Sequence, residues 1–472
     1  MRQSMVLSGL TFPRFVSSAV LTFFLPFFMA CLRAQSGEIA GTMPEDYLPE
    51  LKTILATAMQ RSPQLLAAEF ERAVQEARIL VADSVRLPNL RGASEFNSNQ
   101  TSVSSNNGSS SRASGVFYRF EAGQAIFHWD ALKNQSEAAR INLLVAEKNF
   151  ALVYRELAVV LRKSYLALVI ENAKLRQGRE ALRLLRNDIA SATDKQERGQ
   201  ISPASVEGDK LRAREVALEL NRGEAEFAAS RRRFARIAGL DDLAEEAIPG
   251  EIPAPIFSPP LAAAMTATLL RDGGKSTLEY EIYDLKVREA ILRHKIEKTR
   301  LLPKINAGAA FSLENSTNVN GATVNQEAFQ RQAVSVSAQW NIFDGFATRG
   351  VIREALAARR LNEKKLANET AAILQNAQLL EQSLKLDAEA LEIGEIRRLL
   401  AVETKKRIVE EAGLGNLPKG DVDRAQIGIL QADAAIFASR ATFLGHWSEF
   451  VSLAGHDPVL NNVPLRHVRE KK

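Results

Sequence analysis

Residues 333–350, AVSVSAQWNIFDGFATRG, join a strand pattern directly to a helix pattern. From Val334 to Ile342 an apolar side chain occupies every second position, which is the period of a strand with one apolar face. The alternation stops at Asp344–Gly345, and a helical pattern of about seventy residues follows without a proline. We therefore expect a chain that changes secondary structure where it leaves a bilayer.

The chain is an internal duplication. Landmark residues recur at an offset of 215 or 216 positions, namely Pro88 and Pro303, Phe127 and Phe343, Gly178 and Gly394, and Pro203 and Pro418. A period this long indicates a duplicated unit of domain size, because solenoid repeats span roughly 20–50 residues. The predicted parts are a signal peptide at 1–34, a first repeat at 35–247, a proline-rich linker at 248–260, a second repeat at 261–456 and a C-terminal tail at 457–472.

The N-terminus has the pattern of a secretory signal. Basic residues precede an apolar run at 16–32, and Pro26 within that run argues against a retained membrane helix. Cleavage after Ala34 is one interpretation. The other is a degraded lipoprotein box that ends at Cys31, the only cysteine, which would then be lipidated.

Each repeat has the same predicted order of helix, strand, polar loop, strand, long helix, turn and helix. The predicted strands are about 88–97, 115–127, 303–313 and 333–343, the loops between them are 97–115 and 314–332, and the long helices are 130–198 and 346–412. The loops are rich in Ser, Asn and Gly and have almost no core-forming residues. Short turns at about 199–204 and 413–419 follow the long helices.

The four strands have the length and pattern of membrane strands. Each alternates over about 9–12 residues, close to what a tilted bilayer strand requires. Trp129 and Trp340 lie near the strand–helix junctions, where an interfacial aromatic girdle is expected, although simple packing also explains them. Four strands cannot close a barrel that has a lumen, and open sheet edges cannot face lipid. Several chains must therefore share one barrel.

The long helices carry a narrow apolar seam. In the first repeat the seam follows a coiled-coil spacing through Phe150, Tyr154, Leu157, Leu161, Tyr165 and Leu168. Much of the rest is Ala, Glu, Arg and Lys. A seam of this width packs neighbouring helices into a thin wall and does not bury them in a thick core.

These features resemble the TolC-like outer-membrane efflux proteins across nearly the whole mature chain. The segment ILATAMQRSPQLLAAEFERAVQEARILVADSVRLPNL (54–90) is similar to the family's first helix, including Ala58 and Ser62–Pro63. The strand exits IFHWD (126–130) and IFDG (342–345) also resemble family positions. The second repeat departs from the pattern, with Thr277–Leu278 where the first has Ser62–Pro63.

The resemblance implies a mainly α protein with a membrane β-barrel. Three protomers, each an internally duplicated chain of long coiled-coil helices plus four transmembrane strands, would form a twelve-stranded barrel continued by an α-helical barrel. It also implies a homotrimer in outer-membrane lipid that serves as the passive exit duct of a tripartite efflux or type I secretion system. The implied partners are a periplasmic adaptor protein and an inner-membrane efflux pump or ABC transporter.

The two turns are the expected contacts with the periplasmic partner. Their candidate residues are Gly199, Ser202, Pro203, Gly413, Gly415, Asn416 and Pro418. Gly199 and Gly413 resemble the glycines that open the family's turns. Ser202 followed by Pro203 is a helix N-cap with proline at the first helical position, and Asn416 before Pro418 is a looser version.

Acidic residues after the second turn are the candidates for a gate. Asp421 resembles the first of the acids that ring the closed entrance in this family, and Arg424 stands near the second ring position, where an acid is expected. Asp423 is one residue out of phase, so both acids cannot point into the pore. The competing interpretation is that Asp421 and Asp423 are helix-start acids within the first turn, where the helix dipole favours anions.

Composition adds no sign of catalysis. The five histidines are scattered without a metal-binding spacing, so we expect no enzyme activity and no cofactor or metal. The formal charge of +5 falls to about +2 when the three leader arginines are removed, which gives no indication of nucleic-acid binding. Two alternatives to a duct remain: a periplasmic coiled-coil adaptor or scaffold of an envelope transport complex, and an exported enzyme on a helical frame.

Overall fold

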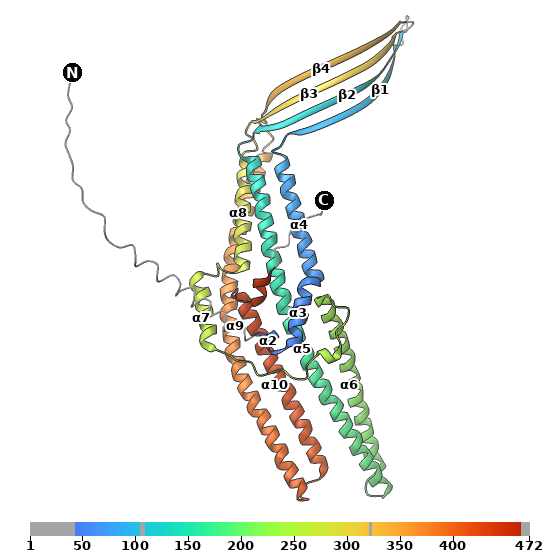
Figure 1. Ribbon diagram of the computed structural model, residues 1–472, viewed down its shortest axis with the longest axis vertical. Helices are drawn as coiled ribbons and strands as arrows, with labels where there is room; N and C mark the ends of the chain where they lie inside the picture. Colours follow the sequence, from blue (N-terminus) through green and yellow to red (C-terminus); the bar gives the residue numbers. More distant parts are fainter. Residues whose placement is uncertain (1–42, 104–108, 321–322, 464–472) are drawn as a thin grey trace, which may run out of the picture.

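The protein is an elongated molecule with a four-stranded sheet at one end of a long helical body (Figure 1). The computed structural model describes residues 43–103, 109–320 and 323–463. Both the predicted signal peptide at 1–34, with Cys31, and most of the tail at 457–472 lie outside these residues.

Two long helices run through the body. They are α5 (Ala131–Glu197) and α9 (Ala347–Gly413), each of 67 residues, so each is about 100 Å long at 1.5 Å per residue. No proline interrupts either helix, and the predicted seam of α5 is buried along its length, from Phe150 to Leu168.

The other helices are shorter and line up beside these two. They are α2 (Pro44–Tyr47), α3 (Pro49–Arg61), α4 (Pro63–Ser84), α6 (Pro203–Ala238), the 3-10 turn η1 (Glu245–Ala247), α7 (Pro259–Asp272), α8 (Leu278–Lys298), α10 (Lys419–Leu453) and the 3-10 turn η2 (Pro458–Asn462). Residues 249–257 have no helix or strand between η1 and α7.

The body is a wall about one helix thick. Between the sheet and the middle, α4 packs on α5, α5 on α8, and α8 on α9. Beyond the middle, α6 packs on α5, α5 on α10, and α10 on α9, so that the two helical hairpins end side by side (Figure 1). Gly178 and Gly394, which match in the repeat, lie against Leu220 of α6 and Ile436 of α10, respectively, where their lack of a side chain permits close helix packing.

One helix in the described part of the chain, α10, is long and apolar enough to cross a membrane by composition alone. It packs along α9 and α5, and its apolar side chains Phe443, Leu444, Phe450 and Val451 are buried there. Part of its apolar surface is therefore buried in the core of the body.

The sheet consists of two antiparallel hairpins in the order β1-β2-β3-β4. Its strands are β1 (Asn89–Val103), β2 (Ser109–Phe127), β3 (Lys304–Asn320) and β4 (Thr323–Gln339). The central pairing of β2 with β3 joins the two repeats and sets Phe120 opposite Phe311. One outer side of β1 and one of β4 have no neighbouring strand within the described protomer.

The predicted loops 97–115 and 314–332 are wrong for most of their length, because the strands continue through them. Asn97 pairs with Gly115 and Ser102 with Ser110, while Asn315 pairs with Ala328 and Val319 with Val324. Ser, Asn and Thr side chains gave these segments a loop-like composition. Backbone ladder hydrogen bonds do not depend on that composition, and a hairpin that extends into water needs no apolar face.

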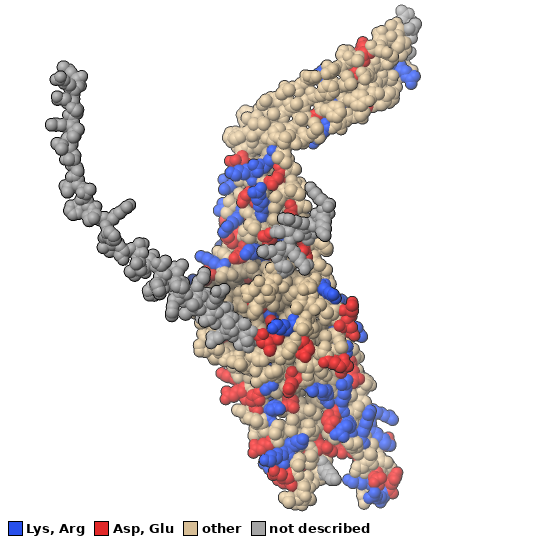
Figure 2. Space-filling model, in the orientation of Figure 1, with Lys and Arg blue, Asp and Glu red and all other residues tan. Residues whose placement is uncertain are grey.

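Charged side chains are unevenly distributed along the molecule. Lys, Arg, Asp and Glu are numerous on the visible surface of the helical body, whereas the visible face of the sheet shows only a few scattered ones (Figure 2). This contrast is expected if the body stands in water and the sheet in a less polar medium.

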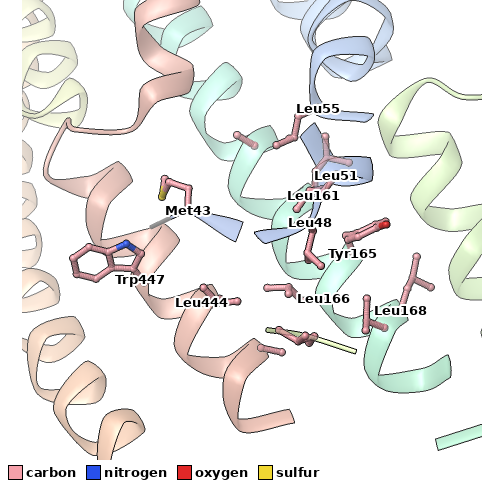
Figure 3. Close-up of a cluster of buried hydrophobic side chains, with 14 of the residues drawn as sticks. Met43, Leu48, Leu51, Leu55, Leu161, Tyr165, Leu166, Leu168, Leu444 and Trp447 are labelled. Atoms are coloured by element: carbon pink, nitrogen blue, oxygen red, sulfur yellow. The ribbon is translucent and has the colours of Figure 1, made fainter. Parts of the chain in front are cut away.

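The hydrophobic core lies in the middle of the body, where the two repeats meet the first and last described segments of the chain. Met43, Leu48 and Leu51 from the N-terminal side pack with Leu161 and Tyr165 of α5 (Figure 3). Leu444 and Trp447 of α10 close the cluster from the other repeat. This cluster in the middle of the body, which we call the waist, packs the two repeats of the thin wall against each other.

A fully buried arginine connects the first and last described segments of the chain at this waist. Arg162 of α5 donates five hydrogen bonds, two to Glu45 (2.8 and 2.5 Å), two to Asp457 (2.6 and 2.9 Å) and one to Ser448 (3.2 Å). These use its five N–H groups. Burial raises the pKa of Asp457, but the bonds from Arg162 and Ser452 lower it more, so the carboxylate is ionised in the folded protein.

Replacing this arginine is expected to destabilise the waist strongly. Arg162→Met leaves the Glu45 and Asp457 carboxylates without their cation, which costs about 3–5 kcal/mol when a buried partner is removed. Denaturant unfolding of the detergent-solubilised protein, followed by circular dichroism, measures the change.

The neighbouring residue is the matched control. Lys163 pairs with Glu449 at the surface, so Lys163→Met is expected to cost at most about 1 kcal/mol. Equal shifts of the unfolding midpoint for the two variants would contradict a special role for Arg162.

Candidate functional site

The sheet separates its side chains by polarity onto two faces. On one face the paired positions are mostly apolar: Leu90, Phe96, Val116, Tyr118, Phe120, Ala122, Ile305, Ala309, Phe311, Leu313, Val334 and Val336. Val334 is 89% exposed and Leu90 is 76% exposed in the protomer. An exposed apolar face of this extent requires an apolar environment.

The opposite face carries the charge. Of the nine charged residues in the described strands, eight lie on this face by register: Arg91, Glu95, Arg119, Glu121, Lys304, Glu314, Glu327 and Arg331. The ninth, Arg112, lies in the outer, polar part of the hairpin opposite Gln100. Alternation of this kind, with one face for lipid and one for a polar lumen, is the pattern of membrane barrel strands.

Both candidate interface tryptophans are at the junction between sheet and body. Trp129 donates from Nε1 to the carbonyl of Pro303 (2.7 Å), and Trp340 donates to the carbonyl of Leu301 (2.9 Å). The rings remain 40% and 59% exposed. Each therefore combines an outward-facing ring with a polar anchor on the turn before β3, which suits a membrane–water interface.

The chain turns sharply from strand to helix at matching places in the two repeats. Trp129 and Asp130 have φ of 55° and 61°, and Gly345 and Phe346 have φ of 63° and 67°. Two successive left-handed residues redirect the backbone from the sheet into α5 and α9. In the second repeat Asp344 then accepts hydrogen bonds from the backbone and hydroxyl of Thr348 (2.9 and 2.5 Å) and so caps α9.

The two turns at the far end of the body share one backbone design. Gly199 (φ 73°) and Gly415 (φ 79°) end α5 and α9 in the left-handed conformation, 216 residues apart, and both are exposed. Gly415 donates to Ala412 and Gly199 to Gln196 through equivalent hydrogen bonds. Gly413 is the last residue of α9 and has no such conformation, so Gly415 is the structural counterpart of Gly199.

The helices that leave these turns begin differently. Ser202 caps α6 by accepting a hydrogen bond from the Ser205 backbone (3.3 Å), with Pro203 as the first helical residue. Pro418 is the N-cap of α10 and has no side-chain cap bond. Asn416 instead donates its backbone N–H to Glu411, so its predicted role as a looser cap is wrong.

The gate candidates point to different partners. Asp421 accepts a hydrogen bond from Nε of Arg424 (3.1 Å) on its own helix, and this bond raises the pKa of Arg424. The pKa of Arg183 in α5 is raised by its bond to Glu180 and, to a lesser extent, by the charge of Asp423. Only Asp421 is in the first turn of α10, which corrects the predicted placement of both acids there.

The described residues contain no group of three or more His, Cys, Asp or Glu side chains arranged to hold a metal ion. Two features were not predicted from the sequence. They are the side-by-side arrangement of charged residues on one face of the sheet and the ion pair between Asp421 and Arg424. The alternation of each strand was visible, but the register that sets charged rows side by side was not.

A comparison with protein families finds one match in the first repeat. Residues 54–240 match the family described as outer membrane efflux protein, from within α3 to just beyond the end of α6. No curated protein matches the chain in sequence.

Solved structures share the fold over most of the chain. The CmeC outer membrane channel of Campylobacter jejuni has a TM-score of 0.70 at 13% identity, covering 87% of each chain. The outer membrane protein VceC of Vibrio cholerae has a TM-score of 0.65 at 14% identity, covering 88% of this chain and 99% of that one. The MtrE outer membrane channel of Neisseria gonorrhoeae, solved in its open state, has a TM-score of 0.62 at 15% identity, covering 88% and 91%.

Proposed function

We propose that this protein, a member of the outer membrane efflux proteins by its matched segment and its fold, is the outer-membrane exit duct of a tripartite efflux system. One observation carries the proposal. A four-stranded sheet with an exposed apolar face and a charged opposite face stands at the end of two helices of 67 residues. The sheet suits a bilayer and the helices suit an aqueous space next to it.

Closure of the sheet requires other copies of the chain. The free sides of β1 and β4 would leave backbone groups unpaired in hydrocarbon, where each costs several kcal/mol. Pairing β4 of one protomer with β1 of the next removes both edges. Three protomers supply twelve strands, enough for a barrel with a lumen.

The exposed sheet also separates this proposal from the alternatives. A periplasmic adaptor or scaffold would share the long helices but has no use for an apolar sheet face with Val334 and Leu90 in water. The charged face of the sheet faces a lumen under this proposal.

The two turns would contact a periplasmic adaptor protein. The adaptor would in turn contact an inner-membrane efflux pump or ABC transporter. Both turns lie at the end of the body farthest from the sheet (Figure 1). Their glycines are exposed, and Leu414 beside Gly415 is 76% exposed. An exposed leucine at each of three equivalent tips would give a partner protein apolar anchors.

The Asp421–Arg424 pair would lie at this entrance. Both residues are on the first two turns of α10, and the arginine is 70% exposed in its side chain. Exposed pairs of this spacing contribute little stability, so the carboxylate can exchange its arginine for a soluble cation.

We expect the purified protein in detergent to be a trimer of about 150 kDa, three times the 52.0 kDa chain. Light scattering with subtraction of the detergent mass measures this. A monodisperse monomer that retains its strand signal would contradict the shared barrel.

The hairpin ends are expected outside the cell, since membrane barrels place their longer extensions there. An epitope inserted after Asn320, at the end of β3, should bind antibody on intact cells. Binding only after the outer membrane is permeabilised would reverse the orientation.

The gate is tested by block of single-channel current with a multivalent cation. Asp421→Asn is expected to weaken block, whereas Arg424→Gln should strengthen it because Asp421 loses its bound arginine. Asp423→Asn is the matched control and should change block little, since Asp423 lies two positions, about 200°, around the helix from Asp421.

Two results would count against this assignment. An effect of Asp423→Asn without one of Asp421→Asn means that the helical phase is wrong. No effect of any of the three substitutions means that the acids only favour the start of α10.

A further inference from the structure

In two adjacent rows on the charged face of the sheet, both repeats place the same charged and aromatic residue types. The first row, in strand order, is Ala93, Arg119, Ser312 and Arg331; the second is Glu95, Phe117, Glu314 and Phe329. Each hairpin therefore contributes one arginine to the first row, and one glutamate and one phenylalanine to the second.

The agreement depends on the strand register and not on the general offset of the repeat. Arg331 lies 212 residues after Arg119, and Glu314 lies 219 residues after Glu95, whereas the offset elsewhere is 215 or 216. The hairpins differ in length, and yet the ladder brings the same side chains to the same level.

The side chains of these rows line a hollow on the sheet. A cavity of about 740 Å³ is bordered by Glu95, Phe117, Arg119, Glu314, Phe329 and Arg331. Arg119 reaches Glu121 only at 3.9 Å, and its side chain is 67% exposed. Its guanidinium group is thus accessible from the space that the charged face borders.

We propose that these two rows form a binding belt for amphipathic organic anions inside the barrel, an inference that rests on the duct proposed above. In a barrel of three protomers the first row supplies six arginines, in three segments that slope with the tilt of the strands. The second row supplies six glutamates that alternate with six phenylalanines along these segments, on the side away from the helical body.

An exported molecule that comes from the helical body reaches the arginine row before the row of glutamates and phenylalanines. The first row is nearer the helices than the second, because β1 starts at Asn89 beside the body, so a solute passes Arg119 and Arg331 before it reaches the second row. Guanidinium groups bind carboxylates and sulfonates through paired hydrogen bonds. The phenyl rings lie about 7 Å further along the strands, two residues at 3.3–3.4 Å each, where they can contact an aromatic part of the same solute.

The barrel is narrow enough for these contacts and the belt is built to release its ligand. Twelve strands spaced 4.8 Å apart and tilted by about 40° enclose a backbone diameter of about 24 Å, which the inward side chains reduce further. Glu95 and Glu314, in the second row, compete with the anion for the arginines. Their negative charge also repels the anion and so weakens its binding. A conducting site must bind weakly enough for its occupant to leave.

The test uses 2-naphthalenesulfonate to block the salt current of the purified protein in a planar bilayer, added on the side of the helical body. Arg119→Gln with Arg331→Gln is expected to raise the half-blocking concentration about tenfold or more, as expected for the loss of hydrogen bonds to a charged group. Arg112→Gln, on the other face of β2 near the hairpin end, is the control and should leave block unchanged.

Further variants and probes keep the test sharp. Arg119→Lys with Arg331→Lys keeps the charge and should retain part of the block, which separates recognition from a folding defect. Phe117→Leu with Phe329→Leu should weaken block by 2-naphthalenesulfonate but not block by methanesulfonate, which has no ring. A naphthalene-bearing ammonium ion should not lose affinity in the Arg→Gln variant.

The outcomes distinguish the belt from the duct. Equal block in the wild type, the double Arg→Gln variant and Arg112→Gln, in pores of normal conductance, would overturn the belt and leave the duct in place. A wild-type protein that forms no pores would overturn both.

Discussion

A β-sheet with free edges cannot lie in hydrocarbon, and this constraint governs the rest of the structure. The protomer has four strands, and β1 and β4 each have one unpaired edge. Its sheet alone therefore cannot be stable in a bilayer. The apolar face of the sheet gains free energy only in lipid, and the charged face only around water. Both requirements are met if β1 and β4 pair between protomers and enclose a lumen.

The helical body follows from the same closure. If the strands close into a ring between protomers, the helices that continue from them also stand in a ring, and each protomer contributes a wall one helix thick. A thin wall has little core, which explains why the buried side chains concentrate at the waist. There Arg162 draws Glu45, Asp457 and α10 onto α5, so the two chain ends are used to thicken the wall.

The sequence was most informative where periodicity was strong. The long helices begin and end within one residue of the predicted bounds, 130–198 and 346–412. A continuous apolar seam without a proline favours one unbroken helix between the strand and the turn. The strand segments in the bilayer alternate clearly, and the repeat shows that both hairpins are alike. The fold of the protomer was therefore accessible from sequence.

Features that depend on register or distant contacts were not accessible. The outer halves of the strands have the Ser and Asn content of loops, and only their backbone pairing reveals a sheet. The sequence does not show whether Gly413 or Gly415 is the counterpart of Gly199, because only the positive φ of Gly415 identifies it. The partners of Arg162 come from both ends of the chain, more than 100 residues away, and leave no local pattern in the sequence.

The most direct test of the shared barrel is a disulfide scan between the two free edges. One cysteine is placed at Asn97 in β1 and a second at each of residues 326–332 in β4 in turn, with Cys31 replaced by serine. Neighbouring strands bring Cα atoms within the range that a disulfide spans. In a barrel of three protomers, some pairs should yield covalent dimers and trimers upon oxidation and nothing larger. Oxidised protein that remains monomeric at every position, or a ladder that continues beyond three chains, would contradict it.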